Sequence, residues 1–260
     1  MKLSTMQDIA GCRAVVSDVR AARQLASLYP RISHDYITLP KPDGYRSIHI
    51  VDRFDSGESY YSYNGCKIEI QIRTRLQHGW AAALETVDFV RDEKLKLGAG
   101  NEEWKRFFLL AAAAIAMREE SPPVPGTPEN EKQLADELRE SADKLNAIEF
   151  LRSLHLGVYS ASRAHLNVLS KGGEAAAYLV TLDMRDSHNM RSRARPYAKE
   201  ELQDAERELM EIEKEYFGDP KRQVLRLSVD KVENLQPAYP AYFLDAQLFS
   251  IAVSDFINRQ

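Results

Sequence analysis

The sequence has few cysteines and no long hydrophobic run, and these two shortages exclude several classes of protein. Its 260 residues include only Cys12 and Cys66, which do not form a CxxC pair. A zinc site or a disulfide framework is therefore not expected, and a reducing cytoplasm is the expected location. The longest apolar run, residues 107–117, has eleven residues. This is too short to cross a bilayer, so no membrane association is expected.

A strong excess of positive charge is also lacking. The formal net charge is −4 at pH 7. Residues 1–120 contain 17 Lys and Arg against 16 Asp and Glu, and residues 121–260 contain 18 against 23. General binding to DNA is therefore not expected, because such binding depends on a basic surface.

Prolines are concentrated in one segment. Residues 121–128 contain four prolines and a glycine, a composition that excludes the interior of a helix or central strand. We therefore predict a linker over residues 121–130. It would separate a domain of residues 1–120 from a C-terminal extension of residues 131–260.

The hydrophobic patterns before and after the linker predict an α+β fold. Strands are expected at residues 9–16, 45–51, 66–74, 175–184 and 223–229. Helices are expected at residues 18–29, 76–90, 102–119, 130–151, 154–170, 197–216 and 241–258. Asp18 is the expected N-cap of the first helix.

The strand over residues 66–74 is expected to carry charge on one face, because side chains alternate along a strand. The residues expected to face the core are Cys66, Ile68, Ile70 and Ile72. The residues expected on the opposite face are Lys67, Glu69, Gln71 and Arg73. A carboxylate between cations and an amide fits the wall of a phosphate site with a bound metal. A solvated, charge-paired face fits the same alternation.

The strand that begins at Tyr45 has a second polar face, formed by Tyr45, Ser47 and His49. The turn before it, residues 41–44, brings Lys41 and then the Tyr45 ring to one edge of the sheet. An exposed tyrosine at this position can stack on a nucleic-acid base. A hairpin turn with a packed tyrosine explains the pattern equally well.

Four segments together resemble a known family. They are Asp8-Ile9-Ala10-Gly11-Cys12-Arg13, residues 35–49, Ile68-Glu69-Ile70-Gln71-Ile72-Arg73-Thr74, and Trp80 with Glu85. Their order and spacing resemble the synthetase domain of RelA/SpoT enzymes and small alarmone synthetases over about residues 1–120. The resemblance implies a nucleotidyltransferase-like, mixed five-stranded sheet flanked by helices. It also implies that the 3′-hydroxyl of GTP or GDP attacks the β-phosphate of ATP, which gives (p)ppGpp and AMP.

The resemblance also implies roles for single residues. Asp8 and Glu69 would hold Mg²⁺, and Glu69 would also activate the attacking hydroxyl. Tyr45 would stack on the acceptor guanine, and Lys41 and His49 would contact its phosphates or ribose. Arg13 would face ATP. The other residues expected to line or support the substrate site are Gln71, Arg73, Ser47, Lys67 and Glu85.

Three positions depart from the family pattern. Only Lys2 is basic among the residues before Asp8, where family members carry a basic helix that grips ATP. His34 replaces a common Lys or Arg, and Asp43 replaces a common Asn. No second His/Asp set accompanies the His34-Asp35 pair, so a synthetase without a hydrolase is expected.

Two further functions stay open. Residues 75–87 resemble the toxic small alarmone synthetases of toxin–antitoxin systems, some of which pyrophosphorylate the 3′ end of tRNA. A catalytically impaired nucleotide-binding module is the third alternative, because of the missing basic helix. Residues 131–260 carry no motif, and self-association or a regulatory partner is expected there.

Overall fold

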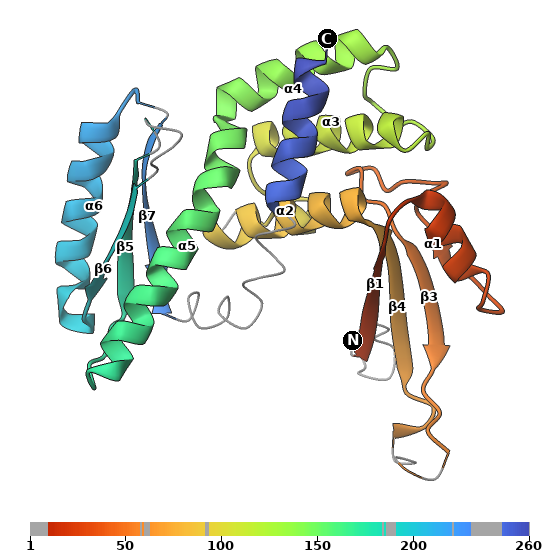
Figure 1. The fold of residues 1–260 in the computed structure, drawn as a ribbon, viewed down its shortest axis with the longest axis horizontal. Coiled ribbons are helices and arrows are strands. Elements are labelled where there is room, and N and C mark those ends of the chain that lie inside the picture. Colours follow the sequence, from red (N-terminus) through yellow and green to blue (C-terminus); the bar gives the residue numbers. More distant parts are fainter. Residues whose placement is uncertain are drawn as a thin grey trace. The chain divides into compact units, whose positions relative to one another are not determined.

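The chain divides into two compact units in the computed structural model (Figure 1). The structure describes residues 10–57, 59, 63–91, 94–183, 185, 191–219, 221–229 and 246–259. The first unit comprises residues 1–81, 102–139 and 255–260, and the second comprises residues 82–101 and 140–254. The proline-rich segment 121–130 is a loop, as its composition predicts, but it lies inside the first unit and does not separate the two.

A mixed sheet forms the centre of the first unit. Its strands are β1 (Ala10–Val16), β2 (His34–Asp35), β3 (Ile48–Arg53) and β4 (Lys67–Thr74), in the order β1-β4-β3-β2. β1 runs parallel to β4, and the other neighbours are antiparallel. The predicted mixed sheet is confirmed, with four strands among the described residues where the family resemblance implied five.

One face of this sheet is apolar and packs against α1 (Val19–Ala26). The helix begins where the sequence predicts, because the Asp18 carboxylate accepts a hydrogen bond of 2.8 Å from the Ala21 amide. Ile70 and Ile72 of β4 lie in the core, as their alternation predicts. The same prediction is wrong for Cys66, which is exposed because it precedes β4.

Three further helices come after β4. They are α2 (Arg75–Arg91), α3 (Glu102–Arg118) and α4 (Glu131–Leu145). In the first unit, Trp80 of α2 donates its indole N–H to the main-chain oxygen of Phe108 on α3 at 2.8 Å. None of the helices in the described part of the chain is long and apolar enough to cross a membrane.

Two glycines allow close approaches beside polar residues of the sheet. Gly11 pairs with Glu69, and a Cβ atom on Gly11 would lie 2.5 Å from the Glu69 main-chain oxygen. Gly44 has a φ of +90°, and its Cβ would lie 2.5 Å from Ala112 of α3. Only glycine fits both the backbone conformation and the space at position 44.

The second unit has an antiparallel sheet of three strands, in the order β6-β5-β7. Its elements are η3 (Leu95–Leu97), α5 (Ala147–Ser170), β5 (Ala177–Asp183), β6 (Arg191–Tyr197), η4 (Lys199–Glu201), α6 (Leu202–Tyr216) and β7 (Arg222–Ser228). Residues 246–258 are helical. Leu179 and Tyr197 pack against Ala205 of α6. The sequence predicted β5, β7 and most of α5 and α6, but neither η3 nor β6, in which exposed arginines and a proline alternate with the half-buried Ser192 and Ala194. The predicted break between residues 151 and 154 is wrong, because α4 and α5 are separated at Asn146.

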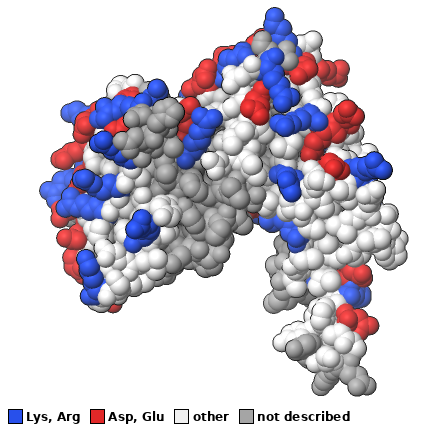
Figure 2. Space-filling view, viewed as in Figure 1, with Lys and Arg blue, Asp and Glu red and all other residues white. Residues whose placement is uncertain are grey.

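Charged side chains of both signs are mixed on the face of the molecule drawn in Figure 2. In the second unit, Arg195 of β6 pairs with Glu208 of α6 at 2.8 Å. Arg222 of β7 pairs with Glu215 of α6 at 2.9 Å. The mixture on this face matches the near balance of acidic and basic residues in the sequence.

We predict that Gly44→Ala destabilises the first unit. The substitution strains a positive φ and drives a methyl group into α3, at a cost of about 1–3 kcal/mol. Urea denaturation of the purified protein measures this cost.

Gly65→Ala is a matched control. Gly65 has a similar φ of +83°, but a Cβ atom there would have no atom within 4 Å. The contact with α3 is unimportant if both variants lose the same free energy of unfolding.

Candidate active site

The polar face of the first sheet gathers most of the predicted site residues. Glu69, Gln71 and Arg73 project from β4 on the face opposite Ile70 and Ile72. The strand register brings Arg13 of β1 and His49 of β3 next to Gln71. The alternation in the sequence therefore produces one polar surface across three strands.

Five side chains on this face close a ring of hydrogen bonds. His49 Nδ1 lies 2.8 Å from Glu69 Oε1, and His49 Nε2 lies 2.8 Å from the Tyr45 hydroxyl. Arg73 donates to the Tyr45 hydroxyl at 2.7 Å and to Gln71 Oε1 at 2.8 Å. Gln71 Nε2 then donates to Glu69 Oε2 at 2.6 Å. Both oxygens of the Glu69 carboxylate are thus held by neighbouring side chains.

The donors and acceptors of the ring assign the proton positions. Arg73 can only donate, and an ionised Glu69 can only accept. Each bond of the ring has one donor and one acceptor if Tyr45 donates to His49 Nε2 and neutral His49 donates from Nδ1 to Glu69. Burial lowers the pKa of His49 below its ordinary value, although the Glu69 carboxylate acts in the opposite direction. The neutral imidazole that the hydrogen bonds require is therefore also the form that burial favours.

An aromatic group adjoins the ring. The Tyr36 ring makes T-shaped contacts with the rings of Tyr45 and His49, at centroid distances of 5.9 and 5.1 Å. The ring of His34 stacks on Tyr36 at 5.4 Å. The ammonium of Lys41 lies 4.9 and 4.8 Å from the centroids of Tyr36 and Tyr45. Burial, with smaller effects from nearby Tyr45 and Glu69, raises the pKa of Tyr36, so its phenol stays protonated.

Sequence reasoning did not assign Tyr36 a role. The available signal was the period-two spacing of His34 and Tyr36 around Asp35, which places both rings on one side. Their partner on β3 could not be identified without the pairing of His34 with His49.

A capping box fixes the junction between Arg73 and α2. The main-chain N–H of Gln77 donates to Thr74 Oγ1 at 3.1 Å, and the main-chain N–H of Thr74 donates to Gln77 Oε1 at 3.2 Å. This reciprocal arrangement starts α2 directly after β4. Glu119 accepts hydrogen bonds from both side chains. Burial raises the pKa of Glu119 above its ordinary value.

Arg46 anchors the loop that carries Lys41 and Tyr45. It is buried, and its guanidinium donates to the main-chain oxygens of Ile37, at 2.6 Å, and of Pro122. The proline-rich loop thereby supports the candidate site. Neither Arg46 nor Glu119 was predicted, because each has charged or polar sequence neighbours that are typical of a solvated surface.

The remaining predicted residues have different surroundings. Asp8 lies outside the described residues. Ser47 is completely buried and donates to the Ile72 main-chain oxygen at 3.1 Å, a contact that supports the sheet. Lys67 is half-buried on the polar face of β4, and Glu85 belongs to the second unit, where it pairs with Lys96 at 2.8 Å. Their contacts with substrate stay predictions.

Glu69 has the chemistry of a Mg²⁺ ligand. Each of its oxygens accepts one of the hydrogen bonds in the ring, which leaves further acceptor positions on the carboxylate. Mg²⁺ prefers such oxygen ligands. The described residues contain no group of three or more His, Cys, Asp or Glu that could hold a metal ion. The predicted site therefore depends on Asp8 as its second carboxylate.

Residues 1–88, which include the hydrogen-bonded ring, are similar to known proteins. Residues 1–88 match the family model described as "Region found in RelA / SpoT proteins". These residues carry a RelA/SpoT-type domain. The described residues of the hydrogen-bonded ring all lie inside this RelA/SpoT region. No curated protein matches the sequence.

Two solved structures are similar to part of the chain. One is small alarmone synthetase 1 from Bacillus subtilis bound to its product pppGpp, with 28% identity and a TM-score of 0.38. The other is small alarmone synthetase 1 from Bacillus subtilis, with 29% identity and a TM-score of 0.37. Each match covers 45% of this chain and 61% of the solved chain, so the sequence spans about three fifths of their length.

We predict that His49 makes stability pH-dependent. Its pKa is lower in the folded protein than the ordinary value of about 6.5. Acidification below that value therefore protonates His49 in the unfolded chain first, and the folded state loses stability, by about 1.4 kcal/mol for each unit of pKa difference. His49→Asn should reduce the loss between pH 7.5 and pH 5.5, measured by urea denaturation.

His34→Asn serves as the control, because His34 is exposed and stands beside the same strand. The neutral assignment of His49 is wrong if the His49 variant retains the full pH dependence of the parent protein.

Proposed function

We propose that the chain is an ATP-dependent pyrophosphotransferase that makes (p)ppGpp from GTP or GDP. One observation carries the proposal: within the RelA/SpoT region, the hydrogen-bonded ring orients the Glu69 carboxylate. Beside it, the Lys41 ammonium lies over the aromatic ring of Tyr45. No hydrolase activity is part of the proposal.

Pyrophosphate transfer depends mainly on positioning and charge neutralisation. His49 and Gln71 hold Glu69 from two sides, so its carboxylate keeps one orientation. In that orientation it can accept a hydrogen bond from the 3′-hydroxyl of the acceptor and take its proton. Arg13 and Lys41 supply positive charge on the same face for phosphate groups.

The proposed acceptor side is formed by Tyr45 and Lys41. The Tyr45 ring offers a surface for guanine, and its hydroxyl remains bound to Arg73. Lys41 would contact the acceptor phosphates. Glu69 and Asp8 would hold Mg²⁺, which neutralises phosphate oxygens and the departing AMP when it is bound.

Transfer to the 3′ end of tRNA is the second candidate. It is favoured by the exposed ring of His34, which stacks on Tyr36 and extends the aromatic group beyond Tyr45. Successive aromatic rings suit a chain of several bases. Such an activity would fit a toxin of a toxin–antitoxin system.

An acceptor assay distinguishes these functions. The full chain is incubated with γ-labelled ATP, Mg²⁺ and either GDP, GTP or deacylated tRNA. The label is expected on the guanine nucleotide, with an equal amount of AMP released. Label on tRNA alone supports the second candidate. No transfer to any acceptor, in a sample that binds nucleotide, contradicts both and leaves a nucleotide-binding module.

We predict that Glu69→Gln lowers the transfer rate by at least about 100-fold, because the variant cannot take the hydroxyl proton or supply a charged metal ligand. The rate of label transfer at saturating ATP measures the effect. Thermal denaturation verifies that the variant is folded.

Asp52→Asn is the matched control, since it neutralises an exposed carboxylate on the adjacent β3. The role of Glu69 is refuted if both variants retain the parent rate.

We predict that two substitutions of Tyr45 have different effects. Tyr45→Phe keeps the ring but breaks the bonds to Arg73 and His49, so kcat should fall about tenfold with little change in the acceptor KM. Tyr45→Ala should also raise that KM by about tenfold or more, since stacking on a base contributes about 1–3 kcal/mol. Steady-state kinetics with GDP measure both constants. Equal KM values for the two variants would contradict stacking.

The C-terminal extension that the sequence predicts has a proposed role of its own. Residues 131–260 are predicted to support self-association or to bind a regulatory partner. Light scattering of the full chain measures self-association, and it does so independently of transferase activity.

A further inference from the structure

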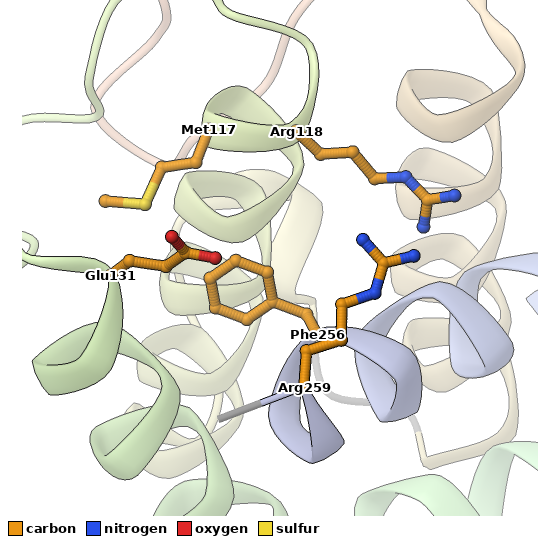
Figure 3. A pocket seen from close by; sticks show the side chains of 5 residues that line it. All are labelled: Met117, Arg118, Glu131, Phe256 and Arg259. Carbon is orange, nitrogen blue, oxygen red and sulfur yellow. The ribbon is translucent and has the colours of Figure 1, made fainter.

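A cavity of about 220 Å³ lies in the first unit (Figure 3). Its lining residues do not belong to the hydrogen-bonded ring. They are Met117, Arg118, Glu131, Phe256 and Arg259. The end of α3, the start of α4 and the C-terminal helix therefore meet around this cavity.

Two guanidinium groups line this cavity without a bound carboxylate. Arg118 and Arg259 are exposed, and within the described part of the chain their side chains make no hydrogen bond or ion pair. Other arginines of the same unit are paired: Arg106 contacts Glu137 at 2.6 Å, and Arg139 contacts Asp136 at 2.8 Å. A helix C-terminus favours a cation and explains the position of Arg118 on its own. It does not explain why a second arginine, Arg259 from another segment, lines the same cavity.

The other walls differ in chemistry. Figure 3 shows the two guanidinium groups at one side of the cavity, Met117 and Glu131 at the other, and the Phe256 ring between them. α4 begins at this wall, and the Asn130 side chain caps it by accepting from the Gln133 amide at 3.0 Å. The first amides of a helix have no partner within the helix and favour anions.

We propose that this cavity binds a phosphate-type anion, held by Arg118 and Arg259. A guanidinium matches two phosphate oxygens at once, and a tetrahedral anion can bridge two such groups. The cavity is smaller than the roughly 300–1,000 Å³ of sites that enclose drug-sized ligands. It therefore fits phosphate, pyrophosphate or the terminal phosphates of a nucleotide whose base stays outside. The proposal does not depend on the transferase activity.

Glu131 should have the opposite effect on anion binding from the two arginines. Its carboxylate lines the same cavity and repels an anion, so it should weaken binding that the arginines strengthen. Neutralising Glu131 and neutralising an arginine must then change the affinity in opposite directions. A general effect of surface charge far from the site would not depend on these positions.

Isothermal titration of the full chain with pyrophosphate, at constant ionic strength, tests the site. Arg118→Gln and Arg259→Gln should each weaken binding by about fivefold or more, and the double variant should lose it. Glu131→Gln should tighten binding by about twofold or more. Arg20→Gln, an exposed arginine on α1, is the matched control and should bind like the parent chain.

Separate arms identify the source of the anion and the site. Parallel titrations with phosphate, AMP and ADP distinguish a free anion from the phosphate end of a nucleotide. A Lys41→Ala/Tyr45→Ala variant should keep the arginine-dependent binding, because those residues belong to the other site. The proposal is overturned if the parent chain binds none of these anions, if the arginine variants bind like Arg20→Gln, or if Glu131→Gln binds more weakly.

Discussion

The fixed orientation of the Glu69 carboxylate depends on a one-way chain of hydrogen bonds. Arg73 only donates and Glu69 only accepts, and the groups between them transmit that polarity along two branches. The ring is largely removed from water, where each bond is stronger and each unmade bond is more costly. Loss of one member therefore leaves its neighbours unsatisfied, and the effect reaches Glu69 even from Arg73 or Tyr45. The carboxylate is positioned by the whole ring.

The ring in turn depends on the register of three strands. His49 lies opposite Gln71, while Ile48 and Ile50 face the core against Ile72 and Ile70. A slip of one residue would move His49 into the core and expose the isoleucines, so the burial of apolar side chains also selects the polar arrangement. Close contacts outside the ring support the same geometry, through the Gly11 approach to β4 and the buried Arg46.

Local periodicity was enough to predict β4 and the shared face of Glu69, Gln71 and Arg73 from the sequence, and the turn residues placed Lys41 before Tyr45. Periodicity cannot reveal which distant segments meet. Arg46 and Pro122 are separated by 76 positions and are joined by a hydrogen bond to a main-chain oxygen, a partner that every residue carries. The proline-rich segment resembled a linker for the same reason: its composition predicts the loop, whereas the burial of Val124 depends on the surrounding helices.

The cations around the ring differ in their freedom to bind a substrate. Lys41 is held by contacts with two aromatic rings, each worth about 0.5–1 kcal/mol where water has access. A charge-assisted hydrogen bond to phosphate contributes about 1.5–3 kcal/mol, so Lys41 can leave the rings for a nucleotide at little cost. Arg73 is buried and donates two hydrogen bonds inside the ring, both of which its movement would break. In the proposed acceptor site, Lys41 would therefore move to the phosphates while Arg73 stays in place. Such a division would let the loop adapt to the phosphates while the carboxylate keeps its position.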